Sequence, residues 1–545
     1  MHFAIAHRRN AAGPVPEQMH LSRTGRVRLV AEGALVGVAV GFVIALYRFL
    51  LSHAEALLRA ITSFLIQHGP LVAIWFFALV LICLIVDRLL VFEPYTQGSG
   101  IPQIDAEVAN QLDMPWYRVL PTKLVEGTLC AFAGLSLGRE GPSILLGGMA
   151  AKGIFRLVGK GSEQRSHERL LVTCGAAAGM SSAFHAPLTG VLFAVEEIHK
   201  SFSPILIISV MTASAASDFV SSHLLGVQPL VHLVVYSSAP HELYPLILLM
   251  GIICGLIGFV HNKGMFLIQD RLFGRLALKA PFVRMIVPFL LAGVVAFVWP
   301  DLLCGGDAIL ERVMDIGNQS ALILLALLLG KYVFTALCFG SGAPGGTLFP
   351  LVAMGSLVGA LYGMAATSIM GTATAYENGF IVLGVAGMFS AVIQAPVTAV
   401  VLVFELTGSL EALLATTLVS VVAYVVSTLL GTEAFYEHLY ARLLGLSAKR
   451  NEDEGQEDLV GNRVMRGHEV VHNYVVGVGS AAEGKLISEV AWPTEALVVT
   501  IREAGVKLVP KGSTRLTALS EVSIIMDEAT ESETDRALHA LFEAH

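Results

Sequence analysis

The chain has 545 residues, of which 55% are hydrophobic and only 14% are charged, against about 25% charged residues in ordinary soluble domains. This composition excludes a disordered chain, a collagen and a disulfide-stapled miniprotein, and it indicates that lipid is the main solvent. The net charge of −8 argues against nucleic acid as a partner, because phosphates attract a basic surface. Six scattered cysteines without a CxxC pair predict buried free thiols rather than a zinc or redox site.

The N-terminal segment is basic and lacks the apolar core of a secretory signal. Residues 1–24 carry Arg8, Arg9 and Arg23, and the first apolar run begins a few residues later. Because basic residues before a first span stay in the cytoplasm, we expect residues 1–24 to be a cytoplasmic tail.

Apolar runs of two lengths follow. Some reach the roughly 20 residues that a bilayer requires; they lie near 27–51, 70–92, 203–222, 244–262, 284–300, 320–338 and 411–431. Others are shorter and interrupted by Gly, Pro or Ser, near 122–134, 143–157, 170–182, 187–198, 347–365, 380–391 and 396–407. Short helices in lipid are tolerated only where protein surrounds them or they line a cavity, so the pattern predicts broken helices around a pathway.

An internal repeat joins the two parts of the membrane region. The segment 123–130 resembles 331–338, and the same offset places Gly138 on Gly346. One residue further, Glu196 falls on Glu405. We therefore expect a transmembrane domain at 25–443 made of two related halves, about 25–222 and 243–443, with a site at their interface.

The last hundred residues have a different character. An acidic, Gly-containing stretch at 451–458 indicates a linker, placed at 444–470. Alternating apolar residues at 497–501 and 506–509 predict a hairpin, 522–526 predicts a further strand, and 531–542 predicts a helix. Residues 471–545 are therefore expected to form a small cytosolic α+β domain.

Three Gly/Pro-rich segments lie where apolar helices begin: 98–103, 138–142 and 346–350. Helix N-termini present free N–H groups and a positive dipole end, so several of them together could hold an anion without fixed charge. Such weak binding suits a permeant ion. Ser99 and Tyr436 could add hydroxyl donors, although Ser99 could equally be a helix N-cap and Tyr436 an anchor at the membrane interface.

Three carboxylates stand in apolar sequence. Glu140 between apolar helices is costly in a membrane unless it is functional, although an ion pair with Arg139 is an alternative. Glu196 and Glu197 are adjacent, and adjacent helical residues face different ways, so at most one of them is expected to face a pathway.

These motifs, GSGIP at 98–102, GREGP at 138–142 and GTLFP at 346–350 together with the repeat, resemble the CLC family of chloride channels and proton-coupled chloride antiporters, with a bacterial, ClcB-like member as the nearest type. The resemblance covers about 25–443. It implies an all-α polytopic membrane protein with the inverted-repeat helical fold and broken helices. It also implies a homodimer with one pore per subunit, in the inner (plasma) membrane, with both termini in the cytoplasm.

The resemblance assigns roles to the motif residues. Chloride would be bound by Ser99, Thr347, Leu348 and Tyr436. The gate and outer anion site would comprise Arg139, Glu140, Gly141 and Phe349, and protons would pass through Glu140 and Glu197. Leu348 stands where the family commonly has an aromatic residue, and Ser99, where nitrate-preferring relatives carry Pro, favours chloride over nitrate; fluoride is a weaker alternative.

Chloride/proton antiport is the function expected from this resemblance, because Glu197 matches the antiporters' inner glutamate. A passive voltage-gated chloride channel and a membrane sensor with a silent pore are the alternatives. No nucleophile–base pair emerges, so an enzyme is not expected, nor a cofactor or metal. The C-terminal residues Gly484–Ile487, Trp492–Pro493 and Gly512–Ser513 resemble the TrkA-C (RCK C-terminal) regulatory module over about 475–530, which implies an unidentified small ligand or dimerisation.

Overall fold

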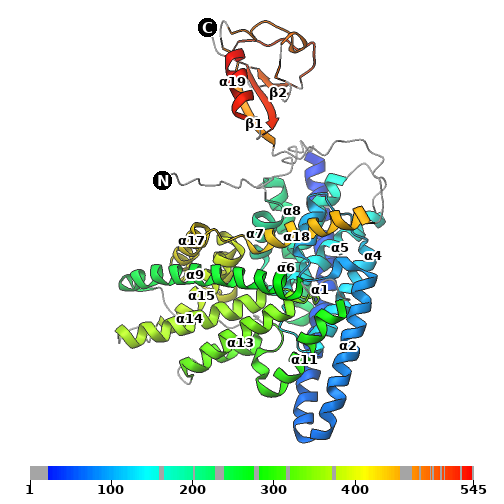
Figure 1. Ribbon diagram of the computed structural model, residues 1–545, viewed down its shortest axis with the longest axis vertical. Helices are drawn as coiled ribbons and strands as arrows, with labels where there is room; N and C mark the ends of the chain where they lie inside the picture. Colours follow the sequence, from blue (N-terminus) through cyan, green and yellow to red (C-terminus); the bar gives the residue numbers. More distant parts are fainter. Residues whose placement is uncertain are drawn as a thin grey trace. The chain divides into compact units, whose positions relative to one another are not determined.

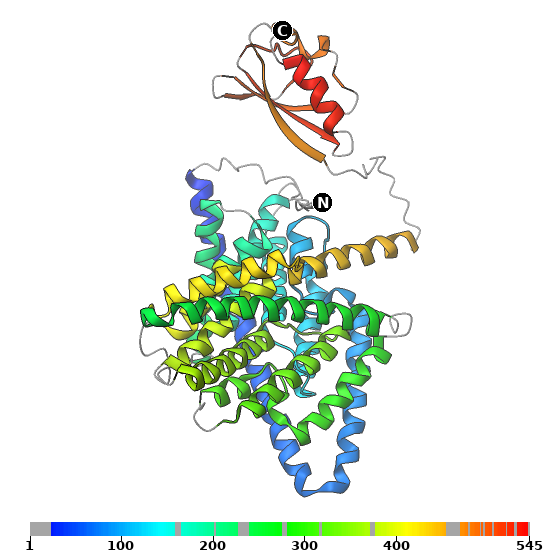
Figure 2. The same cartoon turned by 60° about the vertical axis from the view of Figure 1, so that its left-hand side comes forward.

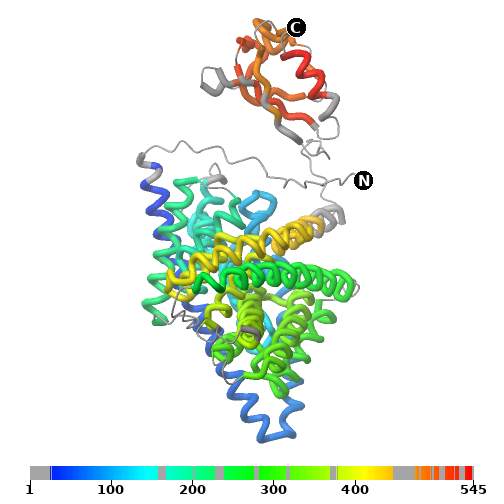
Figure 3. The backbone as a smooth tube through the Cα atoms, turned by 90° about the vertical axis from the view of Figure 1, so that its left-hand side faces the viewer, coloured from blue at the N-terminus to red at the C-terminus, as the bar shows by residue number. Residues whose placement is uncertain are grey.

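The computed structural model divides the chain into two compact units, which Figure 3 traces as tubes. The larger unit is described over residues 23–158, 165–200, 203–226, 239–274, 281–314, 319–370 and 376–453. The smaller unit is described over 469–477, 480–490, 492–493, 496–503, 506–508, 510–518, 520–527 and 531–542. The expected N-terminal tail, 1–24, lies almost wholly outside the described residues.

The larger unit is helical throughout its described residues (Figure 1). Its first half comprises α1 (Arg23–Gln67), α2 (Val72–Phe92), α3 (Ile101–Val108), α4 (Trp116–Phe132), α5 (Glu140–Val158), α6 (Arg165–Phe184), α7 (Pro187–Phe193) and α8 (Pro204–Leu225). Its second half comprises α9 (Tyr244–Leu267), α11 (Pro281–Val298), α12 (Asp307–Val313), α13 (Ala321–Gly340), α14 (Leu348–Met370), α15 (Glu377–Ile393), α16 (Pro396–Thr407), α17 (Leu413–Leu429) and α18 (Phe435–Asp453).

Seven helices in the described residues are long and apolar enough to cross a membrane. Six of them match the predicted long runs. The seventh is Leu348–Ser368, which the sequence placed among the short pieces because its small residues weaken the apolar signal. Conversely, the predicted long run at 411–431 contains only the 17-residue α17. Figure 2 shows the turn at Gly69–Leu71 that joins α1 to α2.

Close helix packing depends on small residues. A Cβ atom at Gly147 of α5 would lie 2.1 Å from the carbonyl oxygen of Gly175 on α6, and one at Gly37 of α1 would lie 2.3 Å from that of Ala213 on α8. No side chain fits in these contacts, so the two glycines let the helix backbones touch, as membrane helices commonly do.

The two halves run in opposite directions where their equivalent segments meet. Gly138 and Gly346 precede α5 and α14, and they form an antiparallel bridge in which each N–H donates to the other's carbonyl oxygen, at 2.7 and 2.8 Å. Equivalent segments that pair antiparallel point in opposite directions, which is the arrangement that an inverted repeat requires. The fold class expected from the sequence is thereby confirmed for the membrane part.

The smaller unit is an antiparallel sheet with one helix. The strands β1 (Glu469–Val475), β2 (Leu497–Glu503), β3 (Val506–Leu508) and β4 (Glu521–Asp527) lie in the order β1-β4-β2-β3, and α19 (Glu531–Phe542) packs on β1 and β4. The predicted hairpin, strand and helix are all present; β1 was missed. In the larger unit, α18 continues to Asp453, into the predicted linker, and residues 454–468 lie outside the described residues.

Candidate functional site

Three Gly/Pro-rich segments meet at the starts of α3, α5 and α14. The N–H of Gly345 donates to the carbonyl oxygen of Gly98 at 3.0 Å, and the Gly138–Gly346 bridge joins the other two segments. A Cβ atom at Gly141 would lie 2.7 Å from the carbonyl oxygen of Ser99, so only glycine lets α5 approach α3 this closely. Three helix N-termini, each with unpaired N–H groups, therefore converge.

Ser99 stands one residue before Gly100, which is the N-cap of α3. Ser99 is buried, and its Oγ accepts a hydrogen bond from the N–H of Ile101 at 3.3 Å. The bond uses a lone pair of the hydroxyl oxygen and leaves the O–H free to donate. The alternative that Ser99 is a helix N-cap is therefore wrong, because Gly100 holds that position, and the Ser99 hydroxyl hydrogen can donate to another group.

Tyr436 enters from α18. Its ring is fully buried and packs edge-on against Phe193 and Phe435, at 6.3 and 5.4 Å between centroids. Its hydroxyl lies near Thr347, yet it meets hydrogen-bond geometry with no residue that the structure describes. The full burial excludes the role of an interfacial anchor and leaves a donor inside the protein without a partner.

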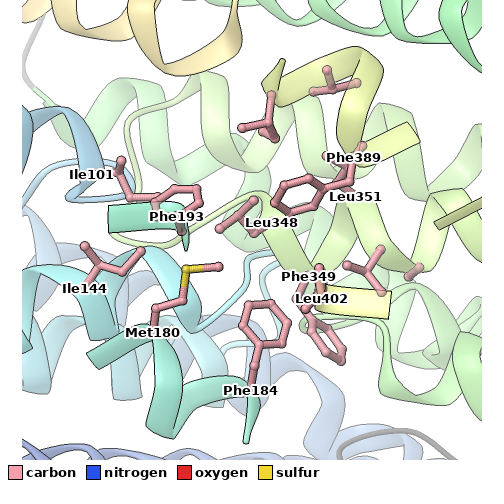
Figure 4. Close-up of a cluster of buried hydrophobic side chains, with 14 of the residues drawn as sticks. Ile101, Ile144, Met180, Phe184, Phe193, Leu348, Phe349, Leu351, Phe389 and Leu402 are labelled. Carbon is pink, nitrogen blue, oxygen red and sulfur yellow. The ribbon is translucent and has the colours of Figure 1, made fainter. Parts of the chain in front are cut away.

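Apolar side chains surround these donors. Figure 4 shows Leu348 next to Phe193, and Phe349 next to Phe184; the rings of Phe184 and Phe349 are 6.2 Å apart. Leu348 is the first residue of α14 and is fully buried. The site therefore combines an apolar wall with a few polar groups, an arrangement typical of small-ligand sites.

Glu140 is the first residue of α5 and is completely buried, with 0% exposure. Neither carboxylate oxygen meets hydrogen-bond geometry with a described residue, although the backbone N–H groups of Glu140 itself and of Phe349 lie close enough to interact with the carboxylate. A Cβ atom added at Gly138 would lie only 2.4 Å from Oε2 of Glu140, so a larger residue at position 138 would collide with the carboxylate. An unpaired buried carboxylate is costly, so its position calls for a functional explanation.

The alternative of an Arg139–Glu140 ion pair is not what the structure shows. The guanidinium of Arg139 lies 3.9 Å from Asp307 and 5.5 Å from the ring centroid of Phe349. Arg139 is thus directed to the opposite half of the protein; it forms no ion pair with Glu140, although its charge remains a neighbour of that carboxylate.

Glu196 and Glu405 each accept hydrogen bonds from the start of a helix in the other half of the protein. The carboxylate of Glu196 accepts from the N–H and Oγ1 of Thr398 at 2.8 and 2.7 Å, at the start of α16. Glu405 on α16 accepts from the N–H and Oγ1 of Thr189 at 2.7 and 2.6 Å, at the start of α7. Charge-assisted bonds to a helix N-terminus are among the stronger ones, so this swap fastens the two halves together.

Glu197, one residue on, faces elsewhere. It lies in a π-helical turn, Ala194–Ile198, is 5% exposed, and its Oε1 has no partner among the described residues. Its charged neighbours include Asp105, Lys200 and Glu437, and Lys200 and Glu437 form an exposed ion pair at 3.0 Å. The prediction that the two adjacent glutamates face different ways is confirmed.

The sequence analysis missed two buried groups. Asp105 of α3 is buried beside Glu197, and its Oδ1 has no partner in the described part of the chain. Lys123 donates from Nζ to the carbonyl oxygens of Thr96 and Gly98 at 2.7 and 2.6 Å, and so holds the segment that carries Ser99. Lys123 lies in the predicted apolar run 122–134, where its charge was the available signal; Asp105 lies in no such run, and its sequence context offered no signal for it.

One cluster could suggest a metal. Ligand atoms of Glu107, Asp113 and Glu168 lie within 4.8 Å of one another. However, Lys152 donates to Glu107 and to Asp113, the latter at 2.6 Å, and Arg156 donates to Glu168 at 2.9 Å. Two cations already occupy the cluster, which makes it an ion-pair network.

A family model described as voltage gated chloride channel matches residues 78–428. The H(+)/Cl(−) exchange transporter ClcA of Vibrio parahaemolyticus is 32% identical over 440 residues, covering 79% of this chain and 92% of its own. ClcA of Salmonella agona is 34% identical over 358 residues, covering 65% of this chain and 75% of its own. Both are ClcA proteins; the ClcB-like placement stays a prediction.

Solved structures of ion antiporters are also similar to this chain. That of a slow cyanobacterial Cl−/H+ antiporter superposes with a TM-score of 0.71 at 26% identity, covering 77% of this chain and 98% of that one. A CLC-type fluoride/proton antiporter, at 21% identity and a TM-score of 0.62, shares the fold. The matched length and the site built from both halves lead to one conclusion: this chain belongs to the voltage-gated chloride channel family, known as CLC, and is a multi-pass membrane transporter rather than an enzyme.

Proposed function

We propose that this protein exchanges chloride for protons across the membrane. The observation that carries the proposal is the buried, unpaired carboxylate of Glu140 at the meeting point of three helix N-termini. An anion held by N–H groups and a carboxylate that accepts a proton compete for the same donors. The Vibrio and Salmonella relatives are named as H(+)/Cl(−) exchangers, which supports the same reading.

Chloride would bind at the start of α14. The hydroxyls of Ser99 and Tyr436 would donate from two sides, and the free N–H groups of Thr347 and Leu348 from a third. The unpartnered Tyr436 hydroxyl supports this assignment. All four donors are uncharged, so the ion can leave as well as bind. Arg139, Gly141 and Phe349 would border the outer anion site, which Glu140 occupies when it is ionised.

Protons and chloride would share the outer part of the pathway and follow separate routes on the inner side. Tyr436 has both Glu140 and Glu197 among its electrostatic neighbours, which supports a chloride site between an outer and an inner carboxyl group. Glu140 would take a proton from outside and Glu197 would exchange it with the cytoplasm, near the exposed Lys200–Glu437 pair. Chloride would move in the opposite direction.

Exchange is tested in proteoliposomes. A chloride gradient is imposed without a proton gradient, and external pH is followed. Because exchange moves net charge, the membrane potential should bias it by about 2.3 kcal/mol per charge per 100 mV. Proton movement against its own gradient is the expected result; chloride flux without a proton signal would overturn the proposal.

A passive chloride channel is the second candidate, since the matching family model is described as a voltage gated channel. In that case Glu140 would only gate the pore and Glu197 would carry no proton. Glu197 is buried, and its Oε1 has no partner among the described residues. This favours exchange, because a carboxyl group with no role would be expected at the surface.

Ser99→Pro is expected to lower the preference for chloride over nitrate. The change removes one hydrogen bond from a neutral hydroxyl to an anion, worth about 1.5–3 kcal/mol, and therefore about ten- to 150-fold in chloride affinity. Nitrate, which is larger, should lose less. Chloride and nitrate binding measured by calorimetry on the purified protein checks this, with Ser143→Ala, also buried but bonded to Arg139 at 2.8 Å, as the control. Unchanged affinities for both anions would remove Ser99 from the site.

The wider assignments follow the family resemblance. They are a homodimer with one pore per subunit, a place in the inner (plasma) membrane, and cytoplasmic termini. The basic residues that precede α1 support the orientation. Cross-linking in membranes and the mass of the detergent-solubilised protein test the dimer.

Residues 471–545 are proposed to be a TrkA-C-like regulatory domain with a small, unidentified ligand. Since every pore residue lies before α18 ends, deleting residues 454–545 should leave chloride and proton fluxes within about threefold of the wild-type values. The liposome assay checks this. Loss of both fluxes in a truncated protein that still elutes as a dimer would make the tail part of the pathway.

A further inference from the structure

A cavity lies directly beside Glu140 on the side of the protein where α1 ends. Its lining includes Tyr47 and Glu55 of α1, Arg139, Glu140 and Asp307. The cavity has a volume of about 30 Å³, which is enough for at least one water molecule. Glu55 lies in the last third of α1, toward the turn that leads to α2, at the opposite end from the N-terminus of α1, which is proposed above to be cytoplasmic. The cavity is therefore the outer mouth of the proposed pathway.

This mouth carries more negative charge than an anion pathway needs. Asp307 is 38% exposed and lies 3.9 Å from Arg139, whose side chain is 20% exposed. Glu55 is half-buried, with Asp307, Arg139 and Lys331 among its charged neighbours. Two carboxylates in front of a chloride site repel the anion and offset the positive charge of Arg139. They call for a role other than chloride binding.

The internal repeat places different residues at equivalent positions of the two halves. The offset that matches Lys123 with Lys331 also matches Ser99 with Asp307. In the first half, Lys123 holds the carbonyl groups of the segment before Ser99. In the second half, Lys331 donates in the same way to Leu302 and Cys304, at 3.1 and 2.7 Å. One half thus presents a neutral hydroxyl to the anion, and the other half presents an acid to the outer mouth.

We propose that Glu55 and Asp307 form an outer proton-collecting pair that supplies Glu140 through water in this cavity. A proton from the external solution protonates one of the two carboxylates, crosses hydrogen-bonded water, and ends on the carboxylate of Glu140; no other bond forms or breaks. Glu140 suits the receiving role, because it lines the cavity, is fully buried, and has two oxygens that meet hydrogen-bond geometry with no described residue. The inference rests on the role of Glu140 proposed above.

Other charged and titratable groups face this pair. Arg59 and Tyr47 come from α1, Arg139 from the segment before α5, Cys304 from the segment before α12, and Lys331 from α13. Cys130 of α4 lines the same cavity. Neutralising the pair leaves these groups in place and removes only negative charge. Arg139, freed from Asp307, would then favour the ionised form of Glu140. Both effects mean that more external acid is needed to protonate Glu140.

The test compares wild-type protein with the double variant Glu55→Gln/Asp307→Asn in proteoliposomes, by chloride flux as a function of external pH and by proton uptake. We expect the external pH of half-maximal chloride flux to fall by about half a unit or more, a threefold change in proton concentration. At external pH values above the midpoint, proton uptake by the double variant should be about tenfold slower than that of the wild type. In saturating external acid the chloride-to-proton ratio should stay that of the wild type, because Glu140 and Glu197 are intact.

Matched variants separate this role from general damage. Glu311→Gln changes an exposed acid on α12 that is absent from the cavity lining and should leave the profile unchanged. Glu55→Asp keeps the carboxyl group and should restore most of the proton uptake. If the double variant is poorly folded, the two single variants are used, each with a smaller shift in the same direction.

An unchanged pH profile in a folded double variant would overturn the proposal, and so would a shift toward higher pH. Chloride flux against external pH can be measured even if the wild-type protein proves to be a passive channel. Failure of exchange and failure of the proton-collecting pair are therefore distinguishable.

Discussion

Replacing Glu140 with Gln is expected to leave chloride flux in place while proton transport falls to background, at least tenfold. The glutamine side chain has nearly the same shape as a protonated glutamate, so it does not compete with chloride as an anion. It cannot bind and release a proton, so coupling is lost. For the same reason the dependence of chloride flux on external pH should disappear. The liposome assay with a chloride gradient and a pH electrode measures both quantities at once.

The matched control for this variant is Glu311→Gln, which makes the same chemical change on an exposed helix position. It should transport both ions at wild-type rates. If Glu140→Gln still drives protons against their gradient, Glu140 has no part in proton transfer, and its burial without partners would need another explanation.

The convergence of the three Gly-rich segments could be predicted from the sequence because it depends on composition. Gly and Pro at helix starts are required where backbones touch, and a Cβ atom at Gly141 would collide with Ser99. The repeat also predicted two related halves. Its direction could not be predicted, since matching residues say nothing about orientation; the Gly138–Gly346 bridge supplies it.

The side-chain contacts across the interface between the two halves could not be predicted from the sequence. Arg139 stands next to Glu140 in the chain, yet its guanidinium is directed to Asp307, because successive residues at a helix start point to different sides. Likewise, the sequence aligned Glu196 with Glu405 without showing that each caps the other half. The length of α14 was underestimated for a simpler reason: its small residues interrupt the apolar run, although they continue the helix.

The final prediction concerns the adjacent pair Glu196 and Glu197, whose roles the structure separates. Glu197→Gln should abolish proton transport and leave chloride flux, because the change removes a buried inner carboxyl group whose Oε1 has no partner among the described residues. Glu196→Gln should keep exchange within about threefold of wild type, since Glu196 is bound to the start of α16 and is unavailable as a carrier.

Glu196→Gln should instead lower the stability of the folded protein. A charge-assisted cap is replaced by a neutral one, at a cost of about 1 kcal/mol. Glu405→Gln makes the same change in the other half, against Thr189, and should lower the thermal midpoint by a similar amount without affecting coupling. Thermal unfolding in detergent together with the liposome assay checks all three variants. Equal loss of proton transport in the Glu196 and Glu197 variants would defeat the relay assignment, because it would mean that the capped carboxylate carries protons as readily as the uncapped one.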